Sequence, residues 1–183
     1  TSKLQNAEDL NEVDTLGFRG EALASIASVS EMSVASRPRL YDVGTQIRYE
    51  YARNAGMTQI GMAPGTVIEV ANLFKNLPAR QKFLKSDSTE FAHVQEALLR
   101  FALAYPAISF TLVSGKKTTL RAAPANDMLR RVRDFFGDDI ADAMVSVNYD
   151  EPEIGSIQGY VSLPPLARAN STAQYTFING RHI

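Results

Sequence analysis

The sequence predicts an α+β fold built around an antiparallel sheet. A short helix is followed by segments in which apolar and polar residues alternate, and turn signals such as Asn54-Ala55-Gly56 and Pro64-Gly65 separate them. Strands that follow one another in this way are typical of an α+β sandwich, whereas a parallel sheet alternates strands with helices. The expected helix is 21–29, and the expected strands are 31–37, 45–51, 57–62 and 66–70.

A long helix is expected to open the second half of the chain. Asp87 or Ser88 can cap it, and Pro106 ends it. Its apolar positions recur at near-helical spacing and are Phe91, Val94, Leu98, Phe101, Ala102 and Tyr105. The change of texture before this helix predicts two domains, 1–85 and 86–183.

Several shorter elements are expected after the long helix. They are a hairpin of 108–113 and 118–121, a helix from about 127 to 136, and strands at 144–150, 156–163 and 173–178. Gly137 is expected to end the shorter helix. The apolar stripe of that helix consists of Leu129, Val132, Phe135 and Phe136, and its three arginines are expected outside the stripe.

The composition is that of an ordinary folded protein of 183 residues. The apolar fraction is 45% and the net charge is −1, so neither disorder nor a globally basic nucleic-acid binder is indicated. There are no cysteines and only two isolated histidines, so we expect no metal site within the chain. No apolar run is long enough to cross a bilayer, and a secretory signal is missing. Because the chain starts at Thr1 rather than at a methionine, we expect it to be a fragment.

Positive charge is concentrated in two stretches. The first contains Arg80, Lys82 and Lys85 without an acidic residue between them. The second stretch, 113–133, contains Lys116, Lys117, Arg121, Arg130, Arg131 and Arg133 against the single acidic residue Asp127. Such runs usually form solvated faces, and they are also candidates for contact with a DNA phosphate backbone. For Arg80 and Lys82 a further interpretation stays open, in which they hold a loop against the sheet.

The most informative stretch is Gly17-Phe18-Arg19-Gly20-Glu21-Ala22-Leu23, which leads into the first helix. A glycine-containing loop that enters a helix directs free backbone N–H groups at one point, and that point suits a phosphate. The spacing alone has low specificity, because most Gly-x-x-Gly turns before a helix are structural. Phosphate binding and a structural turn therefore both remain interpretations of the spacing.

Four blocks in the same order resemble the MutL family of mismatch-repair ATPases, which belong to the GHKL superfamily together with gyrase B, Hsp90-type chaperones and histidine kinases. The first two blocks are Thr1-Ser2-Lys3-Leu4 and Leu16 to Ile26, which is similar to the family's nucleotide lid. The other two are Gly65 to Leu84, containing Asn76-Leu77-Pro78-Ala79-Arg80, and Phe177 to Arg181. The resemblance implies the remainder of a GHKL-type ATPase α/β sandwich in 1–85. It implies a transducer domain, similar to domain 2 of ribosomal protein S5 with a mixed sheet and helices, in 86–183.

The resemblance implies ATP and Mg²⁺ as cofactors of the intact protein. The ATP-binding residues that carry over are Thr1, Ser2, Lys3, Gly17, Phe18, Arg19, Gly20, Glu21, Ala22, Leu23 and Thr66. The family's general-base glutamate and magnesium-binding asparagine are expected upstream of Thr1. We therefore expect no catalytic residue in the chain, no hydrolysis by the fragment alone and no tightly bound nucleotide.

The function that the resemblance implies is an ATP-driven switch, in which ATP binding and slow hydrolysis control dimerisation, DNA binding and recruitment of repair partners. The expected partners are DNA, a mismatch-recognition protein, downstream repair enzymes and a second copy in a homodimer, in the bacterial cytoplasm and without a membrane. Two alternatives remain open, namely a non-enzymatic nucleic-acid-binding scaffold and a gyrase-B-like topoisomerase subunit.

Overall fold

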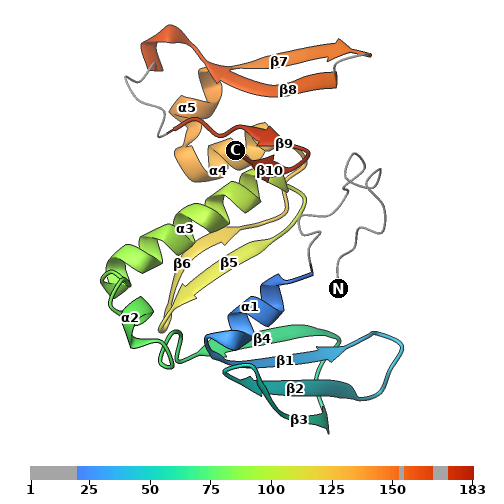
Figure 1. Ribbon diagram of the computed structural model, residues 1–183. Coiled ribbons are helices and arrows are strands. Elements are labelled where there is room, and N and C mark those ends of the chain that lie inside the picture. Colours follow the sequence, from blue (N-terminus) through green and yellow to red (C-terminus); the bar gives the residue numbers. More distant parts are fainter. Residues whose placement is uncertain (1–19, 153–154, 167–172) are drawn as a thin grey trace. The chain divides into compact units, whose positions relative to one another are not determined.

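The computed structural model describes residues 20–152, 155–166 and 173–183. The chain divides into two compact units, the first ending at Ser86 and the second beginning at Asp87. Both units combine helices with antiparallel strand pairs (Figure 1), which confirms the expected α+β class.

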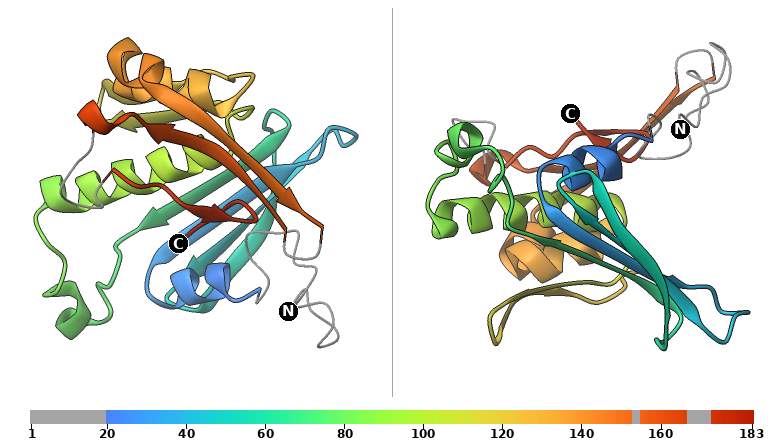
Figure 2. Two further views of the ribbon diagram at one scale, coloured as in Figure 1. Left: turned by 90° about the horizontal axis from the view of Figure 1, so that it is seen from above. Right: turned by 60° about the horizontal axis from the view of Figure 1, so that its bottom comes forward.

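The first unit is a twisted four-stranded antiparallel sheet with a helix against one face (Figure 2). Its elements are α1 (Ala22–Ser28), β1 (Glu31–Arg37), β2 (Gly44–Glu50), β3 (Arg53–Ile60), β4 (Gly65–Ala71) and α2 (Pro78–Gln81), and the strand order is β3-β2-β1-β4. The buried residues of this unit include Ala27 and Ser30 at the end of α1, and Met32 and Ala35 on β1. The helix and the four strands expected in this half are confirmed.

One predicted turn is a bulge within a strand. The sequence predicts a turn at 54–56, but the chain reverses at Tyr51 and Ala52, which have φ of 48° and 71°. The register between β2 and β3 then shifts beside Tyr49, where β3 carries one extra residue. The glycine of the predicted turn, Gly56, has φ of 128° in this bulge and lets β3 continue, so β3 begins earlier than the sequence suggests.

The second unit contains three two-stranded antiparallel sheets and three α-helices within the described ranges. Its elements are α3 (Asp87–Ala104), β5 (Phe110–Ser114), β6 (Lys117–Ala122), α4 (Met128–Phe136), α5 (Asp138–Asp142), β7 (Met144–Glu151), β8 (Gly155–Ser162), the 3₁₀ turn η2 (Pro164–Leu166), β9 (Phe177–Ile178) and β10 (Arg181–His182). Each sheet pairs consecutive strands, which short connections can make only antiparallel. The described strands of this unit therefore form three separate antiparallel pairs, whereas the resemblance implies a mixed sheet.

The core of the second unit agrees only in part with the predicted stripe on α3, of which Ala102 is fully buried. Leu103 is buried with Val132 and Ala141, and Leu99 packs against them. The predicted positions Val94 and Phe101 are 50% and 46% exposed. Residues at i and i+4 share a helix face, so 99 and 103 point together, whereas 101 points to the opposite side. The apolar residues of this helix therefore occupy more than one face.

The ends of the remaining elements mostly follow their predicted signals. The Asp127 carboxylate caps α4 by accepting a hydrogen bond from the Arg130 backbone N–H at 2.7 Å, and Gly137 ends the helix at φ 90°. The strand expected at 173–178 is shorter, because only Phe177–Ile178 pairs, with Arg181–His182 across the Asn179-Gly180 turn.

Candidate nucleotide-binding site

The start of α1 is the described part of the predicted nucleotide motif. Gly20 has φ of 69°, a left-handed conformation that glycine adopts without strain, and it turns the chain into the helix. The first i to i+4 hydrogen bond of the helix runs from the Ser25 N–H to the Glu21 carbonyl oxygen at 2.8 Å. Gly20, Glu21, Ala22 and Leu23 are all exposed. The first turn of the helix is therefore open to a ligand.

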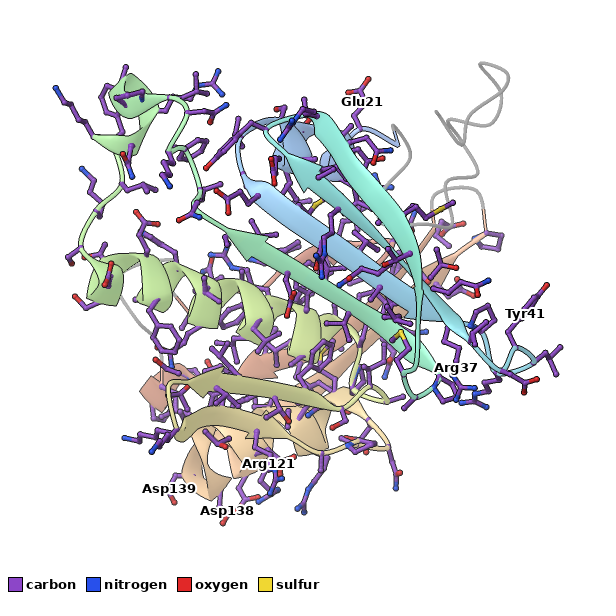
Figure 3. The ribbon with its side chains drawn as sticks, turned by 90° about the horizontal axis from the view of Figure 1, so that it is seen from below. Glu21, Arg37, Tyr41, Arg121, Asp138 and Asp139 are labelled. Atoms are coloured by element: carbon purple, nitrogen blue, oxygen red, sulfur yellow. The ribbon has the colours of Figure 1, made fainter. Side chains whose placement is uncertain are left out.

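Of the other predicted nucleotide-binding residues, only Thr66 lies within the described ranges. Thr1, Ser2, Lys3, Gly17, Phe18 and Arg19 lie outside the described residues. Thr66 lies on β4 opposite Ser36, and their hydroxyls are 2.9 Å apart. Arg37, the neighbour of Ser36, lies far from Glu21 in Figure 3. The described residues thus supply separate parts of a site.

A small polar network lies at the other end of α1. The Tyr51 hydroxyl donates to one oxygen of the Glu31 carboxylate at 3.1 Å, and the Asn72 side-chain amide donates to the other at 2.8 Å. Burial, the hydrogen bond to Glu31 and the charges of Glu31 and Glu50 raise the pKa of Tyr51 above its ordinary value. Glu31 and Tyr51 lie outside the four blocks, and the block that contains Asn72 assigns it no role, so the sequence alone did not identify this network.

The basic candidates fall into two structural classes, of which the first is exposed. Arg80 and Lys82 lie at α2, and Lys85 follows them, all exposed. Lys116 and Lys117 lie at the tip of the β5–β6 hairpin, where Gly115 has φ of 58°. In the described part of the chain, Lys116 and Lys117 form no ion pair. Their charges are available to an anionic partner.

The second class is engaged in ion pairs on α4 and α5. Arg130 lies 3.2 Å from the Asp134 carboxylate, and Arg133 bridges Asp138 at 2.5 Å and Asp142 at 2.6 Å. The hydrogen bonds to Asp142 and Asp138 raise the pKa of Arg133. Asp138 and its neighbour Asp139 are labelled on α5 in Figure 3. The acidic stretch that follows the arginines therefore neutralises part of their charge.

The prediction that Arg131 is a surface contact for DNA is wrong. Arg131 is fully buried, and its Nη2 donates to the carbonyl oxygens of Pro106 at 2.5 Å and Ile108 at 2.8 Å. Burial lowers the pKa of its guanidinium. Arg131 stands three residues after Met128 and four before Phe135, which places it beside the apolar stripe. This spacing was the available signal that the side chain points inward.

The described residues contain no group of three or more His, Cys, Asp or Glu residues that could hold a metal ion. Among them, no helix combines the length and apolar character needed to cross a membrane.

The chain is similar over its whole length to bacterial DNA mismatch repair proteins. It is 41% identical to the DNA mismatch repair protein MutL of Chlorobium phaeobacteroides and 44% identical to that of Citrifermentans bemidjiense, in each case over 100% of the chain. The chain spans only 29% and 28% of these two relatives. The profile of a family described as "DNA mismatch repair protein, C-terminal domain" matches residues 132–183.

A solved structure has the same fold over nearly the whole chain. The Aquifex aeolicus MutL ATPase domain complexed with ADP superposes with a TM-score of 0.74 at 33% identity, covering 97% of this chain and 66% of that one. The fold is thus that of GHKL-type ATPase domains. The chain belongs to the MutL family of DNA mismatch repair proteins. This assignment replaces the gyrase-B-like alternative.

Proposed function

We propose that the start of α1 binds the phosphates of ATP, and that the chain is part of the ATP-driven switch of a MutL-type protein. The supporting observation is Gly20, which at φ 69° leads into an exposed first helical turn. Backbone N–H groups at such a turn suit phosphate oxygens. The Aquifex aeolicus relative is a MutL ATPase domain complexed with ADP, which supports the same ligand here.

In this function the chain's own residues bind and orient the nucleotide. The backbone of Gly17–Leu23 and the Thr1–Lys3 block contact the phosphates, and the Thr66 hydroxyl contacts the adenine side. Bound Mg²⁺ neutralises phosphate charge. Since the described residues offer no cluster of acidic or histidine ligands, we assign neither a metal ligand nor a general base to them. The 183-residue chain alone is expected neither to hydrolyse ATP nor to bind it tightly.

Equilibrium binding of ATP, with Mg²⁺, to the intact protein tests the proposal. Gly20→Ala forces a Cβ into left-handed backbone, which costs about 1–2 kcal/mol. It also adds a methyl group beside the phosphates, so we expect Kd to rise about tenfold or more.

The matched control is Gly115→Ala. Gly115 also has positive φ, 58°, and nothing lies within 4 Å of the Cβ position. This variant carries similar backbone strain in the other unit and should keep the ATP affinity. Unchanged affinity of the Gly20→Ala protein would contradict the proposal.

A second candidate function is DNA binding that does not depend on nucleotide, as in a scaffold. It is favoured by the exposed Lys116 and Lys117 at the hairpin tip. Replacing both with glutamine should flatten the dependence of log K on log salt by about 2, because each phosphate contact contributes about 0.9. Arg130→Gln is the control, since its charge already pairs with Asp134. An effect of ATP on DNA affinity would favour the switch over the scaffold.

The domain roles and partners are also proposals. We propose that 1–85 is the C-terminal part of the GHKL ATPase domain and that 86–183 is the transducer domain. The profile match at 132–183 lies within the second unit, which supports this division. The intact protein would act in the bacterial cytoplasm as a homodimer that engages DNA, a mismatch-recognition protein and downstream repair enzymes. Light scattering of the intact protein with and without a non-hydrolysable ATP analogue tests the dimer.

A further inference from the structure

Hydrogen bonds from other segments of the first unit hold the C-terminal end of α1. A helix leaves its last four carbonyl oxygens without partners inside the helix. Here the carbonyl oxygens of Ala27 and Ser28, the last two helical residues, and those of Val29 and Ser30, which follow the helix, each accept a hydrogen bond from a distant segment of the first unit. We call these four hydrogen bonds the α1 clasp. It replaces the glycine cap that commonly ends a helix.

Two segments provide the donors. At the β2–β3 turn, the Tyr51 N–H donates to the Ser30 carbonyl at 3.0 Å and the Ala52 N–H donates to the Ala27 carbonyl at 2.8 Å.

The second segment follows β4. The Phe74 N–H donates to the Val29 carbonyl at 2.7 Å, and the Asn76 side-chain amide donates to the Ser28 carbonyl at 3.1 Å. Asn76 is therefore the only member of the clasp that acts through a side chain.

Backbone strain in the described part of the first unit is concentrated at the clasp. Its non-glycine residues with positive φ are Tyr51 at 48°, Ala52 at 71°, Asn72 at 54° and Phe74 at 61°. Three of them donate clasp hydrogen bonds or adjoin a donor, and the fourth, Asn72, binds Glu31 beside Tyr51. Such conformations persist only where the surroundings impose them. The clasp is therefore a specific arrangement.

The clasp determines where α1 lies. A seven-residue helix is far too short to be stable by itself in water. Leu23 and Ile26 are 47% and 37% exposed, so burial fixes the helix mainly near Ala27. Hydrogen bonds join this end to the segments that flank the strands, and the opposite end of the helix carries Gly20 and the nucleotide motif. A change in the orientation of the α1 axis would displace the nucleotide motif.

We propose that Asn76 is a positioning residue for the nucleotide site, acting through the clasp on α1. The inference rests on the proposed binding of nucleotide phosphates at Gly20–Leu23. Without the Asn76 hydrogen bond, α1 adopts several orientations, of which only one binds the nucleotide. The apparent affinity for the nucleotide is therefore lower. Asn76 is itself exposed, so its replacement leaves the buried residues of the unit in place.

The test uses the intact protein and two variants. Asn76→Ala removes the hydrogen bond, and Asn76→Asp keeps the side-chain size while replacing the donor with an anion at the negative end of the helix. Ser33→Ala is the matched control, because it removes a side-chain hydrogen bond to Glu69 within the same sheet but outside the clasp. The measurements are Kd for Mg²⁺-ATP and for ADP, and amide hydrogen exchange of residues 24–30 without nucleotide.

For Asn76→Ala we expect a Kd about fivefold higher, the fold-change that a single hydrogen bond typically produces. Hydrogen exchange of residues 24–30 should be faster in Asn76→Ala than in the unchanged protein. Asn76→Asp should raise both the Kd and the exchange rate more than Asn76→Ala does. Ser33→Ala should have the Kd and the exchange rate of the unchanged protein. Faster exchange with unchanged Kd overturns the inference, and so does unchanged exchange. If the unchanged protein binds neither ATP nor ADP, the proposed function itself fails and the role of Asn76 fails with it.

Discussion

The hydroxyl of Tyr51, in the turn that joins β2 to β3, donates a hydrogen bond at 3.1 Å to the carboxylate of Glu31 at the start of β1. Tyr51 also donates its backbone N–H to Ser30, so one residue joins the strand start, the turn and the end of α1. The Tyr51 phenol must stay protonated to donate.

The first prediction concerns pH. The pKa of Tyr51 is higher in the folded chain than in the unfolded chain, because burial and Glu31 disfavour the phenolate. The stabilisation by its hydroxyl is therefore complete below about pH 10, the ordinary tyrosine pKa, and is lost as pH rises through the folded value. Comparing unfolding of the chain with that of Tyr51→Phe from pH 7 to 11 measures this. The stability difference should be constant up to about pH 9 and shrink above pH 10; a difference that grows with pH would refute it.

The second prediction concerns the turn itself. Ala52 has φ of 71°, where a Cβ is strained and glycine is not. Ala52→Gly removes this strain but increases the entropy of the unfolded chain, so we expect a net gain of about 0.5–1 kcal/mol. Urea denaturation provides the measurement, and Ala35→Gly, on a regular strand, should destabilise. A loss of stability at Ala52→Gly would show that the turn is not strained.

The third prediction concerns the buried arginine. Arg131→Met keeps an apolar side chain of similar length but leaves the Pro106 and Ile108 carbonyl oxygens without this donor. We expect a loss of about 2–4 kcal/mol in urea denaturation. Arg130→Met on the same helix loses only a surface pair with Asp134 and should cost less than about 1 kcal/mol. Equal effects of the two variants would argue against the buried position of Arg131.

The fourth prediction concerns the Asn179-Gly180 turn. Gly180 has φ of 75°, and a Cβ at this position would collide with the Tyr105 hydroxyl. Gly180→Ala should lower stability by about 2 kcal/mol through strain and displacement of that ring. The double variant with Tyr105→Phe removes the colliding oxygen and should recover part of the loss, as measured by thermal unfolding. Full stability of Gly180→Ala alone would be the contrary result.

Elements with a local cause could be predicted from the sequence. Alternation sets β1 at Glu31–Arg37, and Asp127 and Gly137 delimit α4, because capping and helix termination depend on neighbouring residues. The motif through Gly20 indicated the family for the same reason, since it is a local chemical pattern. The Asn54-Ala55-Gly56 signal was wrong because a bulge and a turn use the same residue types.

The sequence by itself determined the α+β class, the order of the strands along the chain and the resemblance to mismatch-repair ATPases, because local propensity and motif spacing carry that information. Only the tertiary structure decided which charges are free. Arg131 is buried, Arg133 pairs with Asp138 and Asp142, and Lys116 and Lys117 remain exposed, although all stand in basic stretches. It also decided that Tyr51, Phe74 and Asn76 hold the end of α1, because hydrogen bonds between segments 20 to 50 residues apart depend on the folded path of the backbone.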